Sequence, residues 1–132
     1  MAIMIKTVEK TALIVTDGTE NIEDMAKTIS LSLQDFKVIL LSAKKFTGTD
    51  LLSANLFFMG AENPDPPSFS YLQKLLAHIN LAGRPCGIFS GSQKTADYLR
   101  TIAKDSELKL FPEPFLGKGD VQAWIKKIID GY

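Results

Sequence analysis

The sequence is short of the residues that metal, redox and nucleophilic sites most often use. It holds one cysteine, Cys86, and one histidine, His78, in 132 residues. A single cysteine excludes an intrachain disulfide, a Cys-x-x-Cys redox pair and a site with several thiolate ligands. His78 lies on a predicted helix without a second histidine or a cysteine beside it, so we expect a surface residue there. We therefore expect no metal site and assign no catalytic residue.

The chain also lacks an excess of either charge and lacks a long apolar run. Fifteen Lys and Arg residues balance fifteen Asp and Glu residues, so no global field favours nucleic acid or an anionic membrane. No apolar run approaches the roughly 20 residues that span a bilayer, and residues 1–6 lack the pattern of a secretory signal. We expect a cytoplasmic protein that binds neither nucleic acid nor membrane.

What the chain does have is enough apolar sequence for one core. Hydrophobic residues make up 45% of it and charged residues 23%, which suits a single compact domain over residues 1–132. Residues 1–10 alternate weakly and precede the first strong apolar run. They are either an extra edge strand or a flexible tail, and the pattern leaves both interpretations open.

Short apolar runs alternate with helical patterns along the chain. The runs are typical of strands covered on both faces, and Asn21 and Ser68 are available as N-caps of the helices that follow the first and third runs. Prolines 112 and 114 end the fifth run, which places it at a sheet edge. We expect strands at 11–16, 37–42, 55–60, 86–90 and 108–111, and helical faces at 22–33, 69–79, 96–103 and 121–128, with one or two helical turns at 47–52.

This alternation predicts a three-layer α/β/α sandwich. Right-handed crossovers leave few arrangements of a parallel sheet, and we choose a five-stranded sheet in the order 2-1-3-4-5. In such a sheet ligands lie beyond the carboxyl ends of the strands, and the first strand-to-helix turn is the usual anion cradle. Here that turn is acidic: Asp17, Glu20, Glu23 and Asp24 gather in it, and Lys27 is the nearest basic residue in sequence.

Four stretches together resemble flavodoxins in their order and spacing: ALIVTDGTENIEDMAKTI, SANLFFMG, RPCGIFSGS, and LKLFPEPFLGKG followed by VQAWIKKII. The resemblance implies the flavodoxin-like fold and a lineage of FMN-dependent electron transfer with a redox partner protein. It favours an electron carrier or a binding module over a catalyst. By this resemblance the cofactor-binding residues are Thr16, Asp17, Gly18, Thr19, Glu20 and Asn21 at the phosphate, Gly60, Ala61 and Glu62 at the flavin edge, and Ser90, Gly91 and Ser92 at the pyrimidine side.

The phosphate loop departs from the flavodoxin pattern Ser/Thr-x-x-Thr-Gly-Asn-Thr-Glu at two positions. Glu20 replaces the glycine and Ile22 replaces the second hydroxyl. Two like charges about 4 Å apart repel by roughly 4 kcal/mol at an effective dielectric near 20. Loop residues 61–67 and 91–94 also lack the aromatic side chains that stack on flavin in that family.

We therefore expect flavin binding to be weakened or lost. Glu20→Gly together with Ile22→Thr should then strengthen it. The alternative is a flavin-free protein-interaction module, including an inactive receiver-like domain, since Gly60 stands where a receiver domain carries an aspartate.

Overall fold

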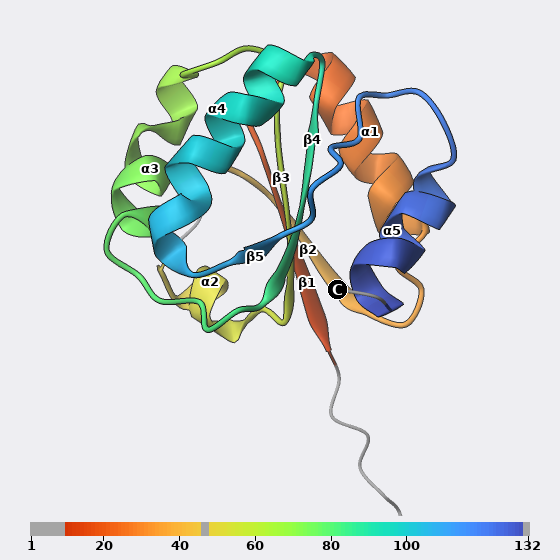
Figure 1. Cartoon of the computed structure of the whole chain (residues 1–132), viewed down its shortest axis with the longest axis horizontal. Coiled ribbons are helices and arrows are strands. Elements are labelled where there is room, and N and C mark those ends of the chain that lie inside the picture. Colours follow the sequence, from red (N-terminus) through yellow and green to blue (C-terminus); the bar gives the residue numbers. More distant parts are fainter. Residues whose placement is uncertain (1–9, 46–47, 131–132) are drawn as a thin grey trace, which may run out of the picture.

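The computed structural model describes residues 10–45 and 48–130. These residues form a parallel sheet of five strands in the order β2-β1-β3-β4-β5, as the sequence predicts. Figure 1 shows α1 and α5 on one side of the sheet and α2, α3 and α4 on the other, which gives three layers. The expectation for residues 1–10, an edge strand or a tail, falls almost wholly outside the described residues.

Strands and helices lie close to their predicted ranges. None of the helices in the described part of the chain is long and apolar enough to cross a membrane. The strands are β1 (Thr11–Thr16), β2 (Lys37–Ser42), β3 (Leu56–Ala61), β4 (Pro85–Ser90) and β5 (Lys109–Leu110), and the helices are α1 (Glu20–Leu31), α2 (Gly48–Ser53), α3 (Ser70–Leu76), α4 (Gln93–Ala103) and α5 (Val121–Asp130), with 3₁₀ turns at Pro67–Phe69 and Lys104–Ser106.

The central strands are buried because both of their faces are covered. On β1, Leu13 and Val15 pack into the core beneath α2, α3 and α4, while Ala12 and Ile14 pack into the core beneath α1 and α5. Trp124 of α5 belongs to the second core, as predicted, with 7% of its surface exposed. The alternation of side chains across a strand explains why an almost continuous apolar run fills both layers.

Two predicted helix caps are wrong. The N-cap of α1 is Thr19, not Asn21, because Thr19 keeps an extended backbone (φ −72°, ψ 149°) and Glu20 already lies in the helix. Ser68 lies inside a 3₁₀ turn that starts at Pro67, and α3 follows with Phe69 as its N-cap. Proline fixes φ near the helical value, so the turn starts one residue before Ser68.

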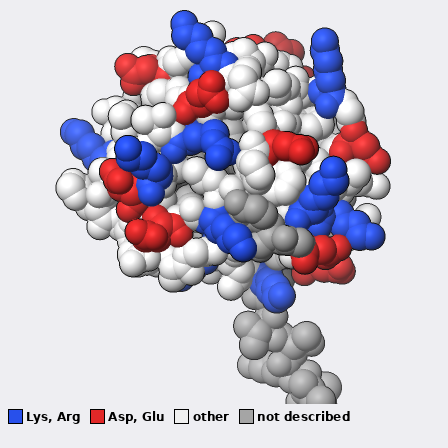
Figure 2. Space-filling view, in the orientation of Figure 1, with Lys and Arg blue, Asp and Glu red and all other residues white. Residues whose placement is uncertain are grey.

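The two edges of the sheet differ. β5, predicted at an edge, pairs with β4 through only two residues, and Pro112 follows it closely. β2, at the other edge, pairs with β1 along all six of its residues. Over the face seen in Figure 2, acidic and basic side chains are interspersed, in keeping with the balanced composition.

Candidate functional site

The residues predicted to hold a ligand all lie where β1, β3 and β4 end. These three strands are neighbours in the sheet, so their carboxyl ends and the loops that follow meet at one edge. Burial divides the twelve residues. Thr16, Gly60, Ala61 and Ser90 are buried within the strands, Asp17 and Glu62 are half-buried, and Gly18, Thr19, Glu20, Asn21, Gly91 and Ser92 are exposed.

Asp17 turns its carboxylate back onto the protein. Its Oδ1 accepts hydrogen bonds from the backbone N–H of Thr19 (3.1 Å) and from the Thr19 hydroxyl (2.7 Å). Its Oδ2 accepts a hydrogen bond from the backbone N–H of Glu62 (2.8 Å), in the loop after β3. Gly18 permits this turn because its φ is +83°, a value that glycine adopts without steric cost. The carboxylate therefore occupies N–H donors in two of the three loops.

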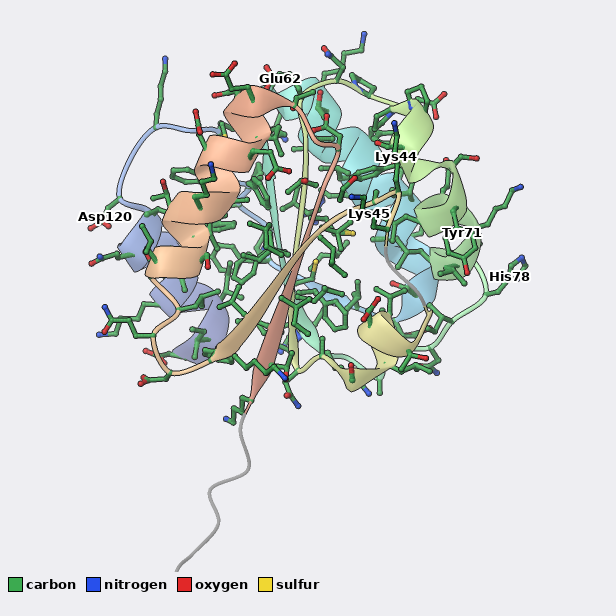
Figure 3. The ribbon with its side chains drawn as sticks, turned by 180° about the vertical axis from the view of Figure 1, so that it is seen from behind. Lys44, Lys45, Glu62, Tyr71, His78 and Asp120 are labelled. Carbon is green, nitrogen blue, oxygen red and sulfur yellow. The ribbon has the colours of Figure 1, made fainter. Side chains whose placement is uncertain are left out.

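Glu62 ties the second loop to the other two. Its Oε2 accepts a hydrogen bond from Asn21 Nδ2 (2.8 Å), and its backbone carbonyl accepts one from the Thr95 hydroxyl (3.1 Å). Its Oε1 would lie 2.5 Å from a Cβ atom at Gly91, so the carboxylate covers that glycine. We call Asp17, Asn21, Glu62 and Thr95 the carboxyl-edge network. Figure 3 shows Glu62 at this end of the molecule, near the start of α1.

The first turn of α1 nevertheless keeps donors that could face an anion. The Thr19 side chain does not cap the helix, and the backbone N–H groups of Glu20, Asn21 and Ile22 donate to no described residue. Such groups and the helix dipole favour negative charge. Glu23, one residue further, instead accepts a hydrogen bond from the Thr16 hydroxyl. The anion cradle is thus partly open and partly occupied by the chain's own carboxylates.

A cavity of about 350 Å³ opens beside this turn. Asp17, Thr19 and Lys44 line one side, and residues 63–68 line the other. Sequence order indicated Lys27 as the nearest cation and missed Lys44, which lies in the turn directly after β2. The sequence could have placed Lys44 here, because parallel strands bring the residues that follow each strand to the same edge of the sheet. The pKa of Tyr98 on α4 is raised mainly by burial of its side chain and further by the negative charge of Asp65, which also lines the cavity.

Glu20 and Ile22, the two departures from the flavodoxin loop pattern, lie in different surroundings from one another. Glu20 is exposed, and no hydrogen bond joins its side chain to another described residue. Ile22 is fully buried in the core under α1, so its side chain is explained by packing. The carboxylate that engages the loop amides belongs to Asp17 instead.

Phe69 and Tyr71, the aromatic residues that begin the segment after the proline-rich loop, do not lie at this edge. Phe69 is fully buried in the core, as predicted. Tyr71 is 53% exposed, and Figure 3 places it on the outer side of α3, well away from Glu62. Neither residue lies where it could stack over a flavin beside Glu62 and Gly91.

Gly60 has a packing role. A Cβ atom there would lie 2.2 Å from Cε2 of Phe89, which is on the neighbouring strand β4. The absence of a side chain at Gly60 therefore makes room for the Phe89 ring within the sheet. This accounts for the glycine without reference to a ligand.

Neither the single cysteine nor the single histidine belongs to the carboxyl-edge network. Among residues 10–45 and 48–130, no group of three or more His, Cys, Asp and Glu side chains is placed to hold a metal ion. Cys86 is fully buried on β4, and burial raises the pKa of its thiol to about 12. A thiol with so high a pKa stays protonated and is a poor nucleophile. His78 is exposed just beyond α3, as predicted.

The sheet order and the layers define a flavodoxin-like fold. Solved structures similar to the chain include a flavodoxin from Streptococcus pneumoniae TIGR4 (TM-score 0.75, 15% identity, 92% of this chain and 99% of that one). Also similar are a short-chain flavodoxin associated with a PDU bacterial microcompartment (0.76, 16%, 92% and 97%) and oxidised flavodoxin 2 from Bacillus cereus (0.76, 16%, 92% and 99%). No protein-family model and no curated protein sequence matches the chain. At these identities the likeness establishes the fold.

Proposed function

We propose that this is a divergent flavodoxin-like protein of FMN-dependent electron-transfer lineage, in which flavin binding is weakened or lost. The fold and the likeness to flavodoxins support the lineage. Bound FMN would supply the electron-transfer chemistry, as cofactors generally do. The residues of this chain, however, fit the cofactor poorly at both ends.

The observation that carries the proposal is the Asp17 carboxylate. It accepts from the backbone N–H groups of Thr19 and Glu62, and it lines the cavity beside the loop. An incoming phosphate would meet a fixed negative charge, and it could recruit the Thr19 amide only by displacing that charge. The free amides of Glu20, Asn21 and Ile22 and the Lys44 ammonium act in the opposite direction, so we expect weak binding rather than complete exclusion.

The flavin end of the site is covered by Glu62. Its carboxylate lies against Gly91 and is held by Asn21, so a ring placed between these loops would have to expel it. Breaking a hydrogen bond to a charged group costs about 1.5–3 kcal/mol. Among the described residues, neither Phe69 nor Tyr71 lies where it could offset that loss through stacking. Charge repulsion and steric cover therefore act in the same direction.

A flavin-free protein-interaction module is the second candidate. The carboxyl-edge network supports it, because three loops are joined by the chain's own polar groups and require no ligand to hold them together. An inactive receiver-like domain is one form of such a module, since the carboxyl end of β3 carries Gly60 and Ala61 where a receiver needs an acid. The partner in either case would be a protein.

The test uses the full chain purified without added cofactor. We expect a colourless protein, and a titration followed by quenching of FMN fluorescence should give a dissociation constant well above the micromolar range. Riboflavin, which lacks the phosphate, is the matched control. Yellow protein, or binding of FMN in the nanomolar range, would refute the weakened site. If millimolar FMN produces no quenching at all, the interaction module is the better description.

A further inference from the structure

The outer edge of β2 is apolar and only partly covered. Every residue of β3, in the interior of the sheet, is buried, whereas residues 38–41 of β2 are all half-buried. Val38 and Leu40 pack toward the core under α1, and Ile39 and Leu41 pack toward the other core. Among the described strands only β1 pairs with β2, so the strand has cover from one side.

The backbone hydrogen bonds identify which groups of β2 face outward. Lys37 N–H donates to the Lys10 carbonyl, toward β1. Because the direction alternates along a strand, residues 39 and 41 also face β1, and the backbone groups of Val38, Leu40 and Ser42 face away. The N–H groups of these three residues donate to no described residue. They form a row of donors on the open side of the strand.

Edges of this kind are usually blocked in soluble proteins by shortness, proline, a bulge or inward-pointing charge. The β5 edge meets this rule, since it has two residues and Pro112 soon after. The β2 edge has six residues in a regular register with β1, and its only charged residue is Lys37 at its start. Such an edge readily pairs with a strand of another chain.

We propose that two copies of this chain form a dimer in which the outer edges of β2 pair with each other, antiparallel. A two-fold axis makes such a contact self-complementary, because the same residues serve both copies. With the axis at Leu40, this residue lies opposite Leu40 of the second copy, and Val38 lies opposite Ser42. All three outward residues are then paired, whereas a shift by two residues would put one of them opposite a turn. The proposal is independent of whether flavin binds.

The same register matches the side chains. A two-fold axis perpendicular to the sheet keeps each face of the sheet on its own side, so the two Leu40 side chains meet on the α1 side. On the other face Ile39 lies opposite Leu41 of the second copy. Apolar pairs directly opposite each other stabilise neighbouring strands. The half-buried residues of β2 would thereby gain cover on the side that β1 leaves open.

The charges beside the strand also fit a second copy. The turn before β2 carries Asp35, and the turn after it carries Lys44 and Lys45, and all three residues are exposed. Figure 3 shows the two lysines at the end of β2. Antiparallel pairing brings the acidic turn of one copy beside the basic turn of the other, at both ends of the interface. Parallel pairing would instead bring lysines beside lysines, which is unfavourable.

Sedimentation equilibrium of the full chain is the first test. We expect a reversible equilibrium between monomer and dimer at concentrations from about 1 μM to about 1 mM, the range of weak to moderate association. A mass that stays at that of one chain over this whole range would overturn the proposal.

Hydrogen exchange of individual amides locates the contact. The amides of Val38, Leu40 and Ser42 should exchange at least about tenfold more slowly in the dimer than in the monomer, since a new hydrogen bond must open first. The amides of residues 39 and 41, which face β1, are internal controls and should not depend on concentration. A dimer that leaves the three outward amides unchanged would refute this interface. Slow exchange at every concentration would refute it too, because the occupant would then belong to the same chain.

Leu40→Lys places two like charges directly opposite each other at the two-fold axis and should weaken dimerisation by at least about tenfold. The matched control is Leu31→Lys, since Leu31 is 77% exposed on α1 and lies outside the proposed contact. Circular dichroism verifies that both variants are folded. Equal dimerisation of the two variants would contradict the proposed contact.

A charge exchange tests the antiparallel direction without touching the strand. Asp35→Lys should weaken dimerisation by about three- to tenfold, because two exposed ion pairs become repulsive. Addition of Lys45→Asp to that variant should restore the affinity, since the opposite charges then face each other with the signs exchanged. If the double variant dimerises no better than Asp35→Lys alone, the two turns do not meet and the antiparallel register is wrong.

Discussion

Replacement of Asp17 by asparagine should strengthen FMN binding while weakening the fold. Asparagine keeps the size of the side chain and one acceptor oxygen, so the hydrogen bonds from Thr19 can persist. The negative charge disappears. A unit charge about 6 Å from one unit of phosphate charge contributes roughly 2.8 kcal/mol of repulsion at an effective dielectric near 20. Its removal corresponds to about a hundredfold gain in affinity.

The same substitution removes an acceptor from the Glu62 amide. Asp17 Oδ2 lies 2.8 Å from that N–H, and the Nδ2 group of asparagine cannot accept it. Loss of one such hydrogen bond should lower the free energy of unfolding by about 1.5–3 kcal/mol. In this one variant, FMN titration should therefore show a gain in affinity, and urea unfolding should show a loss of stability.

Asp24→Asn is the matched control. Asp24 is exposed on α1, one turn beyond Glu20, and the substitution changes net charge by the same amount. We expect its effect on FMN affinity to be small. If Asp17→Asn stays folded and binds FMN no more tightly than the natural sequence, the carboxylate is not what limits binding. If both variants gain equally, the general field matters and the position of Asp17 does not.

Three further predictions concern packing and pH. Ile22→Thr should lower the free energy of unfolding, measured in urea, by about 2 kcal/mol, because Ile22 is fully buried and a hydroxyl would replace its ethyl group. An unchanged value would contradict the packing role. Gly60→Ala should lower the free energy of unfolding by about 1–3 kcal/mol, because the new methyl group would overlap with Phe89. Gly48→Ala is the control and should leave that free energy unchanged, since no described atom lies within 4 Å of its new Cβ. Burial raises the pKa of the Cys86 thiol to about 12 in the folded state, from an ordinary value of 9.0. The unfolded state therefore loses this proton first, and above pH 9 the free energy of unfolding should fall by about 1.4 kcal/mol per pH unit from this group. Cys86→Ala should remove that slope, and identical pH profiles would contradict the buried thiol.

The layers and the strand order could be predicted because they follow from local patterns. Buried strands such as 37–42 are continuous apolar runs, and their alternation with helices admits few topologies. The caps were harder to place. Asn21 and Thr19 are both good N-cap residues, and the choice depended on the extended backbone of Thr19, which no propensity distinguishes.

The orientation of the acidic residues could not be predicted from their spacing. Sequence alone singled out Glu20, since it replaces a glycine of the family pattern, but Asp17 is the residue that bonds to the loop. Its direction depends on the positive φ of Gly18 and on Glu62, which lies 45 residues away. Lys44 shows the converse case. Its place after the second strand made its position at this edge predictable, although it is far from the acidic turn in sequence.

The carboxyl-edge network also bears on the order in which the molecule assembles. Its hydrogen bonds join residues separated by 45, 41 and 33 positions along the chain, and contacts between such distant residues form slowly. The bonds from Glu62 to Asp17 and Asn21 cannot close before β1 and β3 have aligned, and the bond from Thr95 cannot close before β3 and β4 have aligned. The Glu62 amide should therefore acquire protection only once β1 and β3 have paired in register, so it serves as a natural reporter of that pairing.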